Sequence, residues 1–175
     1  MMRRLTIFIA VILAALFEVS FLSVLPAPLS QIRVTIIIAI GLLTGFHFGE
    51  FFVAALLGGA VLDALSPEPI GTHLLAMAGA SALIYLLFTR VLTNVSWPSL
   101  VTINAVAFLS YYVLLTLIRA VQDAFDARSV FFLPSSGSAA RFLAALVIQI
   151  AVAAVAAGGF RRAKAALRSP FLILH

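Results

Sequence analysis

Three ionisable residues in or beside apolar stretches are the candidates for acid–base chemistry: Glu18, Asp63 and His73. A charged group in such surroundings is costly and is usually paired or functional. Acid–base catalysis would require at least two of them to meet in one polar cavity. The chain has no His-Glu-x-x-His, Gly-x-Ser-x-Gly or glycine-rich phosphate motif. We therefore expect no enzymatic activity, and a small membrane enzyme would need a cavity shared by these three residues.

Asp63 stands near the end of an apolar stretch, just before the turn Ser66-Pro67-Glu68-Pro69-Ile70-Gly71. Three interpretations are open for its carboxylate. It caps the turn before Ser66 and Pro67, it pairs with His73 or an arginine inside the bundle, or it binds a solute or a proton. Its place near the end of the stretch argues against a proton relay.

Other polar residues in apolar stretches predict structural contacts. Glu18 is expected to face the bundle interior, and Asn104 and Gln149 are expected to form hydrogen bonds between helices. His47 and His73 are isolated histidines, and the chain has no cysteine. No spacing supplies three metal ligands, so we expect no metal site and no cofactor.

Small residues recur at helical spacing. Gly41, Gly45 and Gly49 are spaced to share one helix face, and Ala55, Gly59 and Asp63 repeat the spacing. Small residues let helix backbones approach closely in lipid, either within the bundle or against a partner. The residues expected to serve in helix packing or partner binding are Gly41, Gly45, Gly49, Gly59, Asp63, Gly71 and His73.

Composition explains why the elements around these residues should be membrane helices. Of 175 residues, 64% are hydrophobic and 10% are charged, whereas a soluble domain carries roughly 25% charged residues. The net charge of +5 comes from basic residues gathered mostly at segment ends. That distribution suits orientation in a lipid bilayer and not nucleic-acid binding, which needs a contiguous basic face.

Hydropathy predicts an all-α membrane protein, a compact bundle of about six transmembrane helices in a single domain over residues 1–175. The expected spans are 5–25, 32–46, 51–65, 72–88, 99–118 and 142–160. The second and third are short, so a re-entrant hairpin in place of two crossings is the alternative. Pro26 and Pro28 are expected to end the first span.

Charge placement predicts that both termini are cytoplasmic. Six crossings put seven basic residues inside and four outside, with Arg33 among the outer ones, as the positive-inside rule requires. The alternative hairpin leaves that count unchanged. The first apolar run spans Leu5 to Leu25. We prefer an uncleaved first helix to a signal peptide, whose apolar region is about 7–15 residues long.

The segment from Gly45 to Leu75 resembles the rod shape-determining protein MreD family. That family shows a small-residue helix running into an Asp, a short turn, and a Gly followed by an apolar helix. The matching positions are Gly59, Asp63, Ser66, Pro69, Gly71 and Leu74. Overall length, the basic start and the number of predicted spans also resemble MreD, whereas the region from Arg119 to Arg141 and the basic tail carry no family signature.

The resemblance implies a non-catalytic, multi-pass protein of the bacterial inner membrane that takes part in cell-wall biogenesis. Such a protein would bind a membrane-anchored MreC-like partner. Through that partner it would act indirectly on the peptidoglycan synthases of the elongation machinery (the elongasome), as a scaffold or regulator of cell shape.

The alternative is a substrate-binding subunit of an energy-coupling-factor vitamin transporter, because MreD also resembles those six-helix proteins. They often carry an Ala-x-x-x-Ala motif on the first helix, and Ala10 and Ala14 have that spacing. In so alanine-rich a helix, ordinary packing is the favoured explanation of this spacing. A vitamin binder should also show aromatic and polar groups around a pocket near the outer surface.

Overall fold

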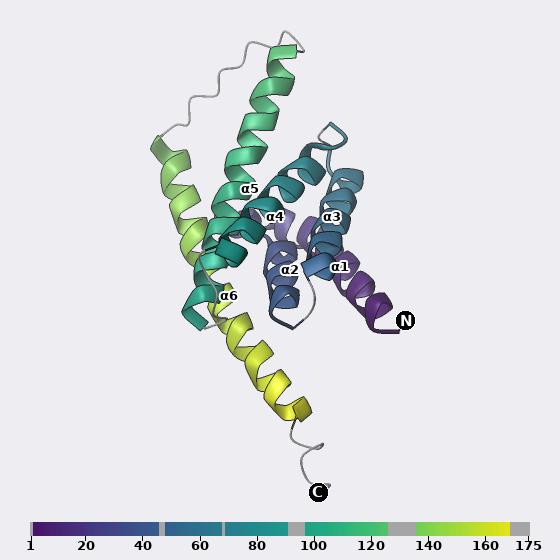
Figure 1. Ribbon diagram of the computed structural model, residues 1–175. Coiled ribbons are helices and arrows are strands. Elements are labelled where there is room, and N and C mark those ends of the chain that lie inside the picture. Colours follow the sequence, from purple (N-terminus) through teal and green to yellow (C-terminus); the bar gives the residue numbers. More distant parts are fainter. Residues whose placement is uncertain (1, 46–47, 68, 91–96, 126–135, 169–175) are drawn as a thin grey trace, which may run out of the picture.

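The computed structural model describes residues 2–45, 48–67, 69–90, 97–125 and 136–168 (Figure 1). Its elements, in chain order, are α1 (Met2–Ser20), η1 (Leu22–Val24), η2 (Leu29–Gln31), α2 (Val34–Gly45), α3 (Phe48–Leu65), α4 (Thr72–Arg90), α5 (Trp97–Phe125) and α6 (Ser136–Arg168), where η denotes a short 3-10 helix. The described residues contain no strand, so the all-α prediction is confirmed. Phe46 and His47, which the sequence places at the predicted break, lie outside the described residues.

Three helices contain stretches that are long and apolar enough to cross a membrane. These stretches are Thr72–Arg90, Pro98–Phe125 and Ala139–Gly159. By contrast, α2 has 12 residues, which corresponds to a length of about 18 Å. A bilayer hydrocarbon core is about 30 Å thick, so α2 alone is too short to cross it.

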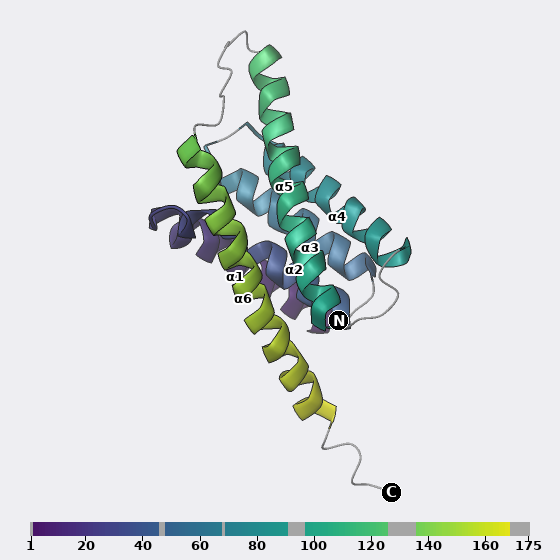
Figure 2. The same ribbon diagram turned by 90° about the vertical axis from the view of Figure 1, so that its left-hand side faces the viewer.

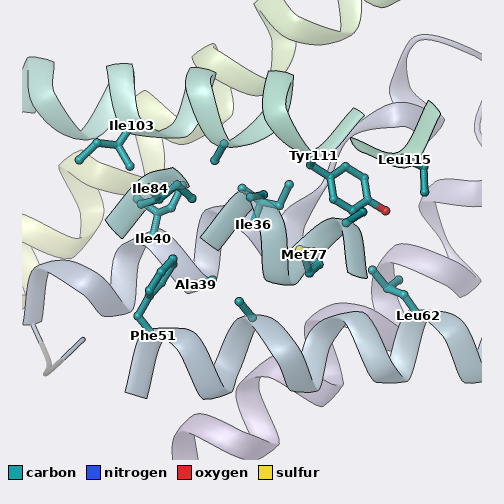
Figure 3. Close-up of a cluster of buried hydrophobic side chains, with 14 of the residues drawn as sticks. Ile36, Ala39, Ile40, Phe51, Leu62, Met77, Ile84, Ile103, Tyr111 and Leu115 are labelled. Carbon is teal, nitrogen blue, oxygen red and sulfur yellow. The ribbon is translucent and has the colours of Figure 1, made fainter. Parts of the chain in front are cut away.

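The helices pack mostly against their neighbours in sequence, with α4 between α3 and α5, and α1 and α2 against α3. One hydrophobic core draws side chains from α1 to α5, and Phe51, Leu62, Met77, Ile103 and Tyr111 are among its members (Figure 3). The last helix, α6, packs on α5, α2 and η2. The buried polar groups described below lie beside this core.

Large apolar side chains also cover the outside of the bundle. Examples are Leu13 on α1, Leu86 on α4, Val113 on α5, and Val147 and Val155 on α6, all exposed. Monomeric soluble proteins rarely expose contiguous apolar patches beyond a few hundred Å². A surface of this kind is typical of helices surrounded by lipid.

Several helix boundaries differ from the predicted spans because apolar length and helix length are different properties. The first α-helix ends at Ser20, and the 3-10 turn Leu22–Val24 follows, although the apolar run continues to Leu25. Pro26 disfavours helical conformation at the residue before it, and Leu25 is extended (φ −74°, ψ 149°), so no helix reaches the end of the apolar run. At the other end, α5 continues to Phe125 and α6 begins at Ser136, beyond the predicted limits at 118 and 142, because polar residues can extend a helix past its apolar stretch.

Candidate functional site

A buried ion pair joins the end of α1 to the start of α2. Arg33 Nη1 lies 2.6 Å from Glu18 Oε1, and the side chains are 17% and 2% exposed. The other carboxylate oxygen of Glu18 accepts hydrogen bonds from the amide and the hydroxyl of Thr35, at 3.2 and 2.9 Å. Glu18 therefore neutralises Arg33 and also caps the first turn of α2, where a negative charge is favoured.

The ion pair bears on two predictions. Glu18 does face the interior, as predicted, being 3% exposed. The placement of Arg33 among the outer basic residues stays a prediction. However, Glu18 neutralises the Arg33 charge inside the bundle. Arg33 therefore adds no unpaired positive charge to the count used for the positive-inside rule.

Gln149 of α6 supplies the polar contacts of the main chain at Arg33. Its Oε1 accepts the Arg33 amide at 3.0 Å, and its Nε2 donates to the Arg33 carbonyl at 3.2 Å. The Nε2 group also lies 3.3 Å from Oδ1 of Asn104 on α5. The prediction that Asn104 and Gln149 make interhelical hydrogen bonds is confirmed, and their contacts tie α6 to α2 and α5.

Two tyrosines of α5 complete the surroundings of Arg33. The guanidinium carbon lies 5.3 Å from the centroid of the Tyr111 ring and 5.7 Å from that of Tyr112, within the range of a cation–π contact. The Tyr112 hydroxyl donates to the carbonyl of Gln31 at 2.8 Å. Sequence reasoning did not identify these tyrosines. They could have been noticed in the sequence, because Tyr111 and Tyr112 are two adjacent residues with hydroxyl groups in an otherwise apolar stretch.

Asp63 caps the start of α4 across the α3–α4 turn. Its carboxylate accepts hydrogen bonds from the amides of Gly71, His73 and Leu74, at 3.1, 2.7 and 3.0 Å. Gly71 has a φ of +96°, which a residue with a side chain rarely adopts. Of the three interpretations, capping describes this geometry, although the cap is for the following helix and not for the turn before Ser66.

The ring of His73 links the Asp63 cap to the Arg33 cluster. Its Nδ1 lies 2.6 Å from the Tyr111 hydroxyl, and its Nε2 lies 3.3 Å from Oγ of Ser66. The contact between His73 and Asp63 runs through the main-chain amide and not through the ring. Because Tyr111 also lies against Arg33, the three candidates Glu18, Asp63 and His73 belong to one continuous buried network.

The glycines predicted to share a face are divided between two helices. Gly41 and Gly45 belong to α2, but Gly49 lies in the first turn of α3. The prediction of one continuous face is therefore wrong, because the chain leaves α2 after Gly45. Nothing lies within 4 Å of a Cβ built on Gly49, so this glycine makes no close packing contact in the described part of the chain.

Gly59 has the close approach expected of a packing glycine. A Cβ built there would lie 2.9 Å from the Leu74 Cα and 3.2 Å from the Met77 Cβ. The backbones of α3 and α4 can therefore approach each other only because residue 59 has no side chain. Together, Gly59 and Asp63 fix the geometry of the α3–α4 hairpin.

Two small cavities and the arrangement of possible metal ligands are the features that bear on ligand binding. No group of three or more His, Asp or Glu residues among them is placed to hold a metal ion. One cavity of about 20 Å³ is bordered by Gly41 and Asn104, and another of about 10 Å³ by Phe51 and Ser81. Each is about the size of one water molecule.

Comparisons with protein-family models, with curated proteins and with solved structures find no match to this chain.

Proposed function

We propose that the protein is a non-catalytic scaffold of the bacterial inner membrane that binds an MreC-like membrane-anchored partner. Through that partner it would act on the peptidoglycan synthases of cell elongation. The observation that carries the proposal is that the positions resembling the MreD pattern form one structural unit. Gly59 lies against Leu74, and Asp63 binds the amides of Gly71 and Leu74.

The remaining positions of that pattern support the same unit. Ser66 contacts the ring of His73, and the carbonyl of Pro69 accepts the Thr72 hydroxyl at 2.7 Å. A pattern whose members build a rigid hairpin is what a docking surface requires, because a preformed surface loses less conformational entropy on binding.

The apolar outer surface and the three long apolar stretches support a multi-pass membrane location. In this proposal the six helices enter the bilayer and both termini lie on the cytoplasmic side. The basic residues near both ends of the chain support that orientation through the positive-inside rule.

The use of the buried polar groups supports a role without chemistry. The Glu18 carboxylate is engaged by Arg33 and Thr35, and the Asp63 carboxylate by three main-chain amides. Groups held in this way satisfy helix ends that membrane lipid cannot satisfy. A vitamin-binding role gains no comparable support, because a small-molecule pocket has a volume of about 300–1,000 Å³ and the cavities reported above are far smaller.

The test is affinity purification of the tagged protein, produced at its native level, from detergent-extracted membranes, followed by mass spectrometry. An equally tagged, unrelated multi-pass protein is the control. We expect enrichment of an MreC-like protein together with cell-wall synthases. Recovery of ATP-binding-cassette ATPases with a transmembrane coupling subunit, and no cell-wall proteins, would overturn the proposal in favour of a transporter subunit.

A further inference from the structure

The connection between α1 and α2, residues Phe21–Ile32, meets the middle of the two longest apolar stretches. Tyr112, which binds the Gln31 carbonyl, lies with Tyr111 near the middle of Pro98–Phe125, whose polar residues Arg119, Gln122 and Asp123 lie toward its end. Gln149, which binds the main chain of Arg33, is at the centre of Ala139–Gly159. If these stretches cross the bilayer, as the proposed function requires, the end of the connection lies at mid-depth.

The beginning of the connection lies at the same level. Glu18, in the last turn of α1, binds both Arg33 and Thr35 at the start of α2. Therefore α1 ends, and α2 begins, beside the middle of α5 and α6. In Figure 2 the connection, in dark purple, projects sideways beside α6, well below the upper ends of α5 and α6. In this arrangement, α1 and α2 form a hairpin that enters the membrane from its inner side and turns within it.

The surface of this connection is mostly apolar, and its exposed polar residue Ser23 donates its hydroxyl to the Val19 carbonyl. No charged residue occurs between Glu18 and Arg33, and the side chains of Phe21 and Val24 are 55% and 82% exposed. Leu29 and Ala27 are also exposed. Such a surface is unsuited to water, so an aqueous cavity does not explain how the connection is covered.

Lipid does not explain it either, because the backbone is irregular. Hydrogen bonds that close its turns are donated by the amides of Leu25, Leu29, Gln31 and Ile32. The carbonyls of Val24, Leu25 and Ala27 have no donor among the described residues. An unpaired carbonyl in hydrocarbon costs several kcal/mol, and irregular backbone at membrane depth is tolerated where protein covers it.

We propose that the α1–α2 connection is a docking surface, at mid-membrane depth, for a transmembrane helix of another protein. That helix would present an apolar face to Phe21 and Val24. It would also carry Ser, Thr, Asn or Gln donors for the free carbonyls. A second copy of this chain fits less well, because two such connections would bring acceptors against acceptors. The inference rests on the membrane location in the proposed function, but it does not depend on the partner being MreC-like.

The first part of the test measures depth with the purified protein in vesicles. The chain has no cysteine, so single variants Val24→Cys, Val147→Cys and Ile70→Cys can each carry one fluorophore. Val147 lies on the exposed face of α6 near Gln149, and Ile70 is 94% exposed in the α3–α4 turn. We expect brominated phospholipids to quench Val24→Cys as strongly as Val147→Cys, and aqueous iodide to quench mainly Ile70→Cys.

Quenching of Val24→Cys by iodide to the extent seen for Ile70→Cys would overturn the inference and make the connection an external loop. If Val147→Cys is not quenched by lipid, the membrane location itself is wrong. The two failures are thereby distinguished.

The second part identifies the occupant in intact cells. A photoreactive p-benzoylphenylalanine replaces Val24, and a matched control replaces Val155, which is 78% exposed on α6. We expect peptide mapping to place the Val24 adduct within an apolar helix of another membrane protein, at several times the Val155 yield. Adducts only to a second copy, or a yield no higher than that of Val155, would overturn the inference. An adduct to a helix of a protein other than an MreC-like one would support the docking surface while contradicting the proposed partner.

Discussion

The Tyr111 hydroxyl lies 2.6 Å from Nδ1 of His73, and the Tyr111 ring faces the guanidinium of Arg33. Tyr111 thus contacts both buried clusters, the one that caps α2 and the one that caps α4. Each cluster satisfies a helix start within a largely apolar bundle. The polar residues of this protein are therefore explained first by the ends of its helices, and that explanation makes measurable predictions.

Removing one member of the Glu18–Arg33 pair should destabilise the fold strongly. Breaking a buried pair costs about 3–5 kcal/mol, because the remaining charge has no partner. We expect Glu18→Leu and Arg33→Met each to lower the midpoint of thermal unfolding in detergent, and the double variant to lower it by less than the sum. A double variant whose loss equals that sum would show that the two charges do not interact. Ile70→Ala, at an exposed position, is the control.

Gly59→Ala should disturb the α3–α4 hairpin, whereas Gly49→Ala should not. The new Cβ at residue 59 would meet the backbone of Leu74 at 2.9 Å, and overpacking of this kind costs about 1–3 kcal/mol. At residue 49 the space is open, and alanine favours the helix by up to about 1 kcal/mol. Thermal unfolding of the two variants side by side checks the prediction, and equal effects would contradict the close approach.

Asp63→Ala should cost about 1–2 kcal/mol through loss of the helix cap, and Asp63→Asn should cost less, because asparagine is also a good cap. The same pair separates capping from a proton or solute role. If Asp63 acts only as a cap, Asp63→Asn should bind its partner less well only to the extent that its unfolding midpoint is lowered. Loss of partner binding in Asp63→Asn, with the unfolding midpoint unchanged, would instead indicate that the charge itself is functional.

Gln149→Leu should loosen α6 from the bundle. The variant leaves the amide and carbonyl of Arg33 without the partners seen at 3.0 and 3.2 Å, and a buried polar group without a partner costs about 1–3 kcal/mol. Val147→Leu, on the exposed face of the same helix, is the matched control. Limited proteolysis and the unfolding midpoint should both distinguish the two variants. Identical behaviour would mean that α6 is held by apolar packing alone.

Much of the fold was predictable because lipid-facing helices require long apolar runs, and hydropathy reports them directly. The limits of α4 and the start of α5 agree with the expected spans to within two residues, whereas α6 begins six residues before and ends eight residues after its expected span. Helix ends were less predictable. The α-helix α1 ends at Ser20 and a 3-10 turn follows it, and α5 extends to Phe125, past its predicted limit at 118.

The candidate site was predictable in its members but not in its contacts. Glu18, Asn104 and Gln149 stand out because they are polar within apolar runs, and the structure buries all three. Arg33 did not stand out, because it lies at the start of a predicted span and resembles an ordinary basic flanking residue. Its pairing with Glu18 depends on the folding of the Phe21–Ile32 connection, which periodicity cannot reveal. The same limit applies to Gly49, because periodicity does not show that Gly45 ends α2 while Gly49 lies in α3.

The measurement that tests the central claim most directly is depletion of this protein in its native cells, with fluorescent labelling of new peptidoglycan. The account predicts that cells widen and lose insertion along the lateral wall, and that the wild-type chain restores both. Unchanged cell width and an unchanged labelling pattern after complete depletion would contradict a role in cell elongation.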